Sequence, residues 1–138
     1  MVNINKTHLT RRQFEVFKKR REGKSLTEIA EELGTSRSNV SSIARIAELN
    51  VEKAKNTLKL IKTIDWPITV DVKAGSNVYD VSDEVFRKAD EKGISISHNY
   101  SELVRLITEM LGKKNLRRRV ALKDFSIMIS KEGEVEIL

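Results

Sequence analysis

The sequence predicts an α+β protein, with an N-terminal all-α helix-turn-helix domain over residues 1–64 and a small α+β domain with a mostly antiparallel sheet over residues 65–138. Three observations support this prediction. Apolar residues recur at helical spacings between residues 10 and 62, whereas they alternate with polar residues after the only proline, Pro67. Basic charge is concentrated in the first half of the chain.

Cap and stop residues delimit three helices in the first half. Hydroxyl side chains that can accept bonds from free N–H groups precede each of them: Thr10, Ser25, and Thr35 or Ser36. Glu28 is placed to complete a capping box with Ser25. Gly23 and Gly34 are expected to end the first two helices, because glycine tolerates the positive φ of a helix C-terminus.

The third helix is expected to be long. Its apolar residues follow one another at alternating spacings of four and three: Val40, Ala44, Ala47, Val51, Ala54, Leu58 and Ile61. This seam predicts a buried stripe of about three heptads. The later residues of the seam, Val51, Ala54, Leu58 and Ile61, could form a homodimer, pack on the first helix or pack on the second domain.

The second half reads as strands and helices in alternation. We expect a strand at 68–72, a short apolar piece at 78–81, a helix from Ser82 to Gly93, an extended piece at Ile94 and Ile96, a helix from Ser101 to Gly112, and a hairpin over 125–137.

Composition excludes several classes of protein. The chain has no cysteine and only two histidines, so neither a disulfide nor a metal site is expected, and no cofactor is predicted. No apolar run approaches the ~20 residues that cross a bilayer, and no signal peptide is recognisable at the N-terminus, so we expect a cytoplasmic protein without a membrane partner. No catalytic motif is recognisable, which argues against an enzyme.

The helix-turn-helix interpretation rests on residue types at particular places. A small residue is needed where the two helices cross, a glycine in the turn, and apolar residues where the helices dock. The sequence supplies all six: Ile29, Ala30, Leu33, Gly34, Val40 and Ile43. An unrelated three-helix bundle is the alternative.

If Val40 and Ile43 face inward, a polar, acid-free face of the helix that starts near Ser36 is left for the major groove of DNA. The residues expected near base edges are Arg37, Ser38, Asn39, Ser41, Ser42 and Arg45. The residues expected at phosphates are Arg11, Arg12, Lys24, Thr35 and Ser36, the last two also being cap candidates.

The charge distribution agrees with a polyanionic partner. Residues 1–64 hold 14 Lys/Arg and 7 Asp/Glu, whereas residues 65–138 hold 12 Lys/Arg and 13 Asp/Glu. A basic half joined to a near-neutral half suggests a nucleic-acid-binding module beside a second, different surface.

The segment "LTRRQFEVFKKRREGKSLTEIAEELGTSRSNVSSIARIAELNVEKAKNTLKL" resembles the N-terminal domain of the archaeal Tfx family, and "VKAGSNVYDV" and "KDFSIMISKEGEVEI" extend the resemblance through the second half. The first segment is also loosely similar to the DNA-binding regions of sigma factors and response regulators. The resemblance implies a DNA-binding transcriptional regulator with an α+β C-terminal domain, and it places Arg37, Asn39 and Ser41 at the start of the recognition helix.

Two functions remain open at this point. The first is a sequence-specific regulator that binds double-stranded DNA. The second is a sigma-like adaptor that docks on the transcription machinery through residues 65–138. The role of Arg117–Arg119 is also open.

Overall fold

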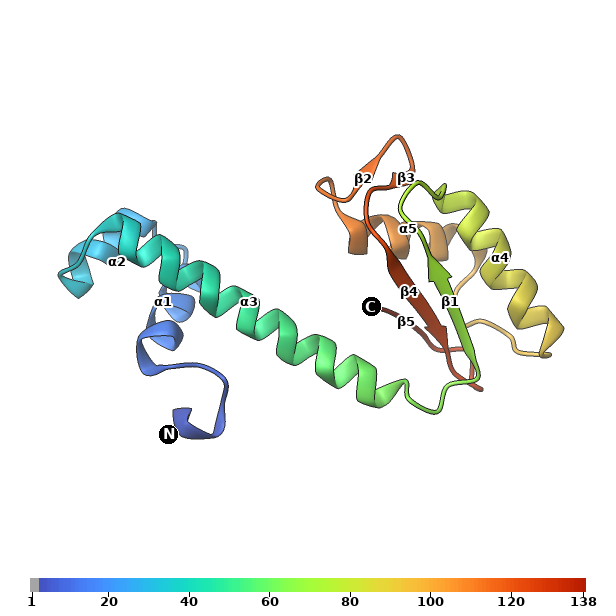
Figure 1. Ribbon diagram of the computed structural model, residues 1–138, viewed down its shortest axis with the longest axis horizontal. Helices are drawn as coiled ribbons and strands as arrows, with labels where there is room; N and C mark the ends of the chain where they lie inside the picture. The colour runs from blue at the N-terminus through green and yellow to red at the C-terminus, as the bar shows by residue number, and fades with distance from the viewer. Residues whose placement is uncertain (1–2) are drawn as a thin grey trace. The chain divides into compact units, whose positions relative to one another are not determined.

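The computed structural model describes residues 3–138 and divides the chain into two compact units, Met1–Leu58 and Lys59–Leu138. The first unit is helical, and the second combines helices with antiparallel strands, so the predicted α+β class is confirmed (Figure 1). Each unit is described by itself. No helix in the described part of the chain is long and apolar enough to span a membrane.

The first unit contains a 3₁₀ turn, η1 (Ile4–Lys6), the helices α1 (Arg11–Arg21) and α2 (Leu26–Leu33), and all but the last turn of α3 (Arg37–Lys62). Thr10 caps α1 in a full capping box with Gln13, because each side chain accepts from the other residue's backbone N–H. Ser25 caps α2 by accepting from the Glu28 N–H at 3.1 Å. The return bond that would complete the expected Ser25–Glu28 capping box is not among the hydrogen bonds of the described residues.

The helix-turn-helix core is small and matches the six expected positions. Its fully enclosed side chains are Val16, Ile29, Ala30, Val40 and Ala44, and Leu33 and Ile43 pack against them half-buried. Gly34 ends α2 in the left-handed region at φ 67°, as its place in the turn requires. The turn thus sets the direction in which α3 leaves α2.

The helix α3 is unbroken over 26 residues and passes through Asn50 without interruption. Its first apolar residues, Val40, Ala44 and Ala47, are buried. The later part of the same seam is more open: Val51 and Ala54 are half-buried, and Leu58 is 71% exposed. The expected heptad pattern therefore serves the core of the first unit only over its first turns.

The second unit is built on a three-stranded antiparallel sheet in the order β1-β4-β5. The strands are β1 (Ile68–Val72), β4 (Phe125–Ile129) and β5 (Val135–Ile137), with Val70 opposite Ile127 and Ile127 opposite Ile137. The helices α4 (Val78–Glu91) and α5 (Tyr100–Leu111) enclose a core of fifteen buried residues with one face of this sheet (Figure 1). The last turn of α3 belongs to the same unit, where the Lys59 Nζ donates to the Ile137 carbonyl at 3.1 Å.

Two helix starts in this unit differ from those expected. Asn77, and not Ser82, caps α4, so the apolar piece at 78–81 is the first turn of the helix. Ser82 is fully buried and its hydroxyl donates to the Val78 carbonyl at 2.9 Å. Asn99, and not Ser101, caps α5 by accepting from the Glu102 N–H.

Two further segments, at 94–97 and at 116–121, complete the second unit. Ile94 and Ile96 belong to no strand, and their segment is held by the Ser97 N–H and hydroxyl, which both donate to the Gly133 carbonyl. In contrast, residues 116–121 form a small hairpin of β2 (Leu116–Arg117) and β3 (Val120–Ala121) that the sequence did not predict.

Candidate nucleic-acid interface

The residues expected near base edges all lie on the first turns of α3 and are exposed: Arg37, Ser38, Asn39, Ser41, Ser42 and Arg45. Because Val40 and Ala44 are buried against α1 and α2, the helix cannot rotate to hide this face. At 3.6 residues per turn, Ser38, Ser42 and Arg45 lie opposite the buried stripe, and Ser41 and Asn39 lie on either side of them. Arg37 lies on the side of the stripe, and it is exposed at the start of the helix, before the first buried residue, Val40. All six predicted residues are thus open to solvent, and five of them share one side of α3.

The N-terminus of α3 is tied down by short polar side chains. The Ser36 hydroxyl accepts from the Asn39 N–H at 3.1 Å, which makes Ser36 the cap that the sequence predicted as one of two candidates. The Asn39 amide donates to the Thr35 hydroxyl at 2.9 Å. Thr35, Ser36 and Asn39 therefore have structural roles in the turn, and the Asn39 amide is pre-positioned by its neighbour.

The electrostatics of this surface favour an anion. No acidic residue occurs between Glu32 and Glu48, so Arg37 and Arg45 face no carboxylate along this part of α3. The free N–H groups at the start of a helix add a partial positive charge. A carboxylate on this face would repel phosphates, whereas serine hydroxyls can donate to phosphates or base edges.

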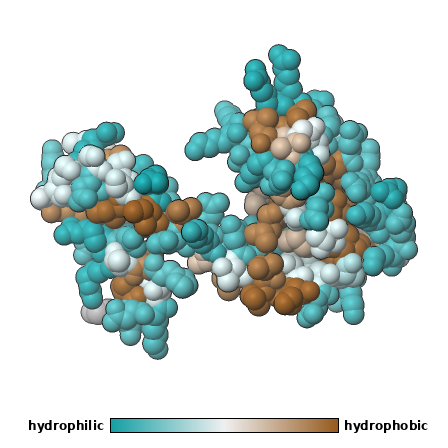
Figure 2. Space-filling view, viewed as in Figure 1, coloured by the Kyte–Doolittle hydropathy of each residue, from teal (hydrophilic) through white to brown (hydrophobic). Residues whose placement is uncertain are grey.

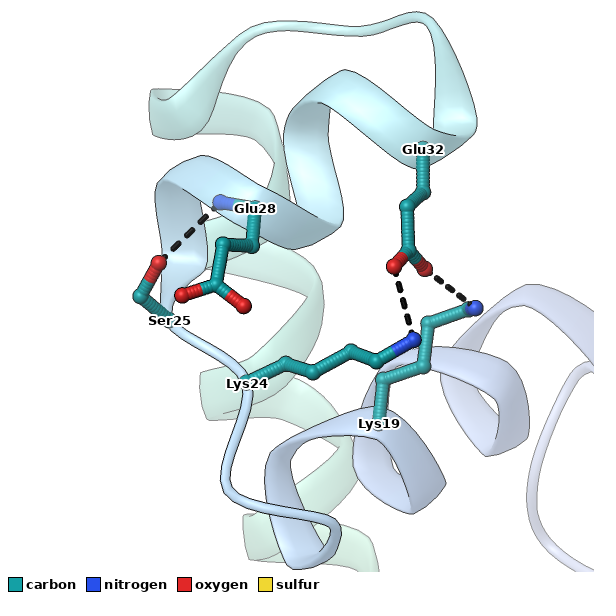
Figure 3. Close-up of polar contacts among 5 residues, drawn as sticks. All are labelled: Lys19, Lys24, Ser25, Glu28 and Glu32. Atoms are coloured by element: carbon teal, nitrogen blue, oxygen red, sulfur yellow. Dashed lines mark hydrogen bonds and ion pairs between the residues drawn. The ribbon is translucent and has the colours of Figure 1, made fainter.

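A compact ion-pair network joins α2 to α1 and to the turn between them (Figure 3). The Glu32 carboxylate binds the Lys19 Nζ at 2.5 Å through one oxygen and the Lys24 Nζ at 2.7 Å through the other. The hydrogen bonds from Lys19 and Lys24 lower the pKa of Glu32, and the bond to Glu32 raises the pKa of Lys24. A phosphate would have to compete with Glu32 for Lys24, so Lys24 as a phosphate contact stays a prediction.

Among the other basic residues of the first unit, Arg11 and Arg12 are exposed on the first turn of α1, where the phosphate prediction placed them. Two cations near the end of α1 have intramolecular roles. The Arg20 guanidinium donates to the Lys24 carbonyl at 3.1 Å, and the Arg21 guanidinium lies 5.1 Å from the centre of the Phe17 ring. These contacts help to hold the end of α1 and its following turn.

The described residues contain no group of three or more His, Asp or Glu side chains that could hold a metal ion. The basic surface that sequence reasoning missed is the β2–β3 hairpin of the second unit. Its only signal was the arginine run Arg117–Arg119, because the turn lacks the glycine or asparagine that usually marks a two-residue hairpin.

Comparisons with known proteins agree with this geometry. Residues 54–137 match the family model described as the C-terminal region of the DNA-binding protein TFX, and residues 7–48 match that of sigma-70 region 4. The chain is 37% identical to a protein of Methanocaldococcus jannaschii that is assigned as a transcriptional regulatory protein, over 97% of both chains. It is 36% identical to one so assigned in Thermococcus kodakarensis, over 96% of this chain and 85% of the relative.

A third relative is the DNA-binding protein Tfx of Methanothermobacter thermautotrophicus, which is 35% identical over 94% of both chains. The matching model covers more than half of the chain, and all three relatives exceed 30% identity over nearly all of it. The resemblance predicted from the sequence is thereby confirmed. The chain belongs to the Tfx family, whose members are DNA-binding transcriptional regulators with a helix-turn-helix region and are not enzymes.

Proposed function

We propose that this chain is a sequence-specific regulator of transcription that binds double-stranded DNA and reads the major groove with the first turns of α3. The observation that supports this most is the acid-free, exposed face from Arg37 to Arg45, whose direction is set by buried Val40 and Ala44. A cytoplasmic location, the compartment in which archaeal chromosomes lie, is part of this proposal.

The proposed contacts fall into two classes. Arg37 would bond a guanine, Asn39 an adenine, and the serines and Arg45 the remaining base edges; all of these side chains are exposed. Arg11, Arg12, Lys24, Thr35 and Ser36 would bind phosphates, and these contacts position the protein without reading sequence.

The experiment begins by selecting a preferred duplex from random DNA and measuring binding of the full chain to it. Arg37→Ala should weaken binding to the selected duplex by about 1–3 kcal/mol and binding to random duplex much less, because it removes a bond to a base. Arg87→Ala is the matched control, since Arg87 is an exposed arginine of α4 paired with Glu91. Equal losses of Arg37→Ala on selected and random DNA would contradict the reading role.

We also propose that two copies pair through the open part of the α3 seam, at Val51, Ala54, Leu58 and Ile61. The support is that Leu58 is 71% and Ile61 is 61% exposed, at a spacing that the buried part of the same helix uses for packing. Helix-turn-helix dimers bind paired half-sites about one helical turn apart, so a palindromic selected site is expected. A monomer in sedimentation at micromolar concentration would overturn this pairing.

The alternative, a sigma-like adaptor that docks on the transcription machinery through the second domain, stays an untested prediction. Pull-down of RNA polymerase in the absence of DNA separates the two functions. Capture of polymerase by residues 65–138, together with no preference among duplexes, would favour the adaptor.

A further inference from the structure

The most basic segment of the second unit is the β2–β3 hairpin with its flanks. Residues 113–123 hold six cations and no acid: Lys113, Lys114, Arg117, Arg118, Arg119 and Lys123. The other residues of the unit, 59–112 and 124–138, hold eight Lys/Arg and thirteen Asp/Glu. The positive charge of an otherwise acidic unit is therefore concentrated in one short segment.

The hairpin presents its arginines at a tight turn (Figure 1). Leu116 pairs with Ala121 and Arg117 with Val120, which leaves only Arg118 and Arg119 to make the turn. Both have positive φ, 51° and 68°, as a type I′ turn requires. Two of the six cations, Arg118 and Arg119, thus form the turn, and Arg117 lies directly before it in β2.

The turn and the second strand of the hairpin are anchored to the body of the unit. The Val78 N–H donates to the Arg119 carbonyl at 2.8 Å, and the Ala121 N–H donates to the Ser76 carbonyl at 2.9 Å. Ala121 is buried, and the Leu122 N–H donates to the Asn115 carbonyl at 2.9 Å. These bonds hold the backbone of the hairpin against the rest of the unit, so its side chains extend from a fixed backbone.

The arginine side chains are available to a ligand. Arg117, Arg118 and Arg119 are all exposed, and none of them forms an ion pair with a carboxylate of the described residues. The Arg119 guanidinium lies 4.9 Å from the centre of the Tyr79 ring, which orients it without neutralising it. Figure 2 shows hydrophilic side chains projecting from the part of the surface where Figure 1 draws this hairpin.

The turn chemistry indicates that these arginines are not there for stability. Two residues with positive φ favour Asn-Gly, and a longer side chain in this conformation costs free energy. The chain nevertheless places arginine at both positions. A residue type that strains the turn while adding charge at its tip is typical of a functional site.

We propose that the β2–β3 hairpin is a second DNA contact, which binds the phosphate backbone of the duplex recognised by the first unit. Arginine suits this role because its planar guanidinium donates two parallel bonds to a phosphate. The hairpin adds affinity and salt dependence, and it reads no bases. This inference rests on the proposed function, because it needs DNA binding by α3.

The test compares two triple variants of the full chain on the selected duplex. The first combines Arg117→Gln, Arg118→Asn and Arg119→Gly, which removes three charges and installs the turn sequence that a type I′ hairpin prefers. The second, a matched control, combines Lys92→Gln, Arg105→Gln and Lys131→Gln, which removes three exposed cations elsewhere in the same unit. Thermal unfolding of both variants would check that each is folded before binding is compared.

The readouts are the slope of log affinity against log salt and the hydroxyl-radical footprint. Each lost phosphate contact reduces the slope by about 0.9, so the hairpin variant should lose about 2–3 units of slope and part of the protected backbone, and the control less than about one. An unchanged slope and footprint, or equal losses in the control, would overturn the hairpin contact while leaving α3 binding intact. Failure of the unaltered chain to bind any duplex would instead overturn the proposed function.

Discussion

The two units differ in how much they bury and in where they place their charge. The helix-turn-helix unit encloses five core residues and spreads basic side chains over α1 and α3. The α+β unit encloses fifteen core residues and concentrates its positive charge in the β2–β3 hairpin. In the first unit, therefore, a small core holds the α3 surface that is proposed to read DNA. In the second unit a larger core supports one basic element, the β2–β3 hairpin.

The largest expected effects come from the two cores. Ile29→Ala and Ile107→Ala each remove a fully buried side chain, and each should lower the free energy of unfolding by about 2–5 kcal/mol. Ile29 is one of five enclosed residues, so its loss should also abolish DNA binding, whereas Ile107→Ala should retain it in the folded molecules. Urea unfolding and fluorescence anisotropy measure both quantities. Equal loss of binding in the two variants would contradict the assignment of DNA binding to the first unit.

Replacing a turn glycine by alanine should lower the free energy of unfolding by different amounts in the two units. At Gly133 an added Cβ would lie 1.9 Å from the Ser95 carbonyl oxygen, so overlap adds to the strain of positive φ and the expected cost is about 2–4 kcal/mol. At Gly34 the added Cβ would meet no heavy atom of the described chain within 4 Å beyond Gly34 itself and its two neighbours, which leaves only about 1–2 kcal/mol of backbone strain.

Thermal unfolding of the two glycine variants provides the measurement. A larger loss of stability for Gly34→Ala than for Gly133→Ala would show that the helix-turn-helix turn is constrained by more than its backbone conformation. DNA binding by Gly34→Ala is informative as well, since a displaced turn would change the direction of α3.

The smallest expected effects concern one carboxylate in each unit. Hydrogen bonds from Lys19 and Lys24 lower the pKa of Glu32, and the Ala74 N–H, at 2.8 Å, followed by Lys73, lowers the pKa of Asp124. A depressed pKa means that each carboxylate stabilises the fold above its unfolded pKa, fully above about pH 5, and that this contribution is lost as the pH falls through the folded pKa.

Carboxyl-carbon NMR titration at low and high salt distinguishes the two causes. Salt should return the pKa of Glu32 towards its ordinary range, because its main stabilisation comes from two half-buried lysines whose charges ions in solution can screen. The pKa of Asp124 should respond less, because a backbone N–H is its first partner. The same salt response at both carboxylates would contradict this difference.

The helix-turn-helix was predictable because its signals are local and agree with one another. Thr10, Ser25, Ser36 and Gly34 act where their short-range chemistry places them. In the second unit two signals competed at the start of α4, where Ser82 precedes two acids but Asn77 caps the helix. Which of two candidate residues caps a helix depends on which of them is buried, and burial depends on contacts between residues distant in sequence.

The hairpin was missed for a related reason. Its turn contains Arg118 and Arg119, whose intrinsic preferences oppose positive φ, so tertiary bonds such as that from the Val78 N–H to the Arg119 carbonyl impose the conformation. The exposed side of α3 could be predicted from the sequence, because the apolar residues Val40 and Ala44 fix which side of the helix is buried.

The ion pair between Lys24 and Glu32 could not be predicted, since it depends on how α1 and α2 pack against each other.

The short side chains at the centre of the α3 face have a consequence for the thermodynamics of recognition. Serine at positions 38, 41 and 42 has few rotamers to lose, whereas ordering a long side chain such as arginine costs up to about 2 kcal/mol of conformational entropy. Small side chains also leave room for ordered water between the helix and the bases, and such water can carry specificity. If this face binds DNA as proposed, its binding should depend strongly on water activity, and osmotic stress with a neutral solute should change the sequence preference of the protein more than its affinity for random DNA.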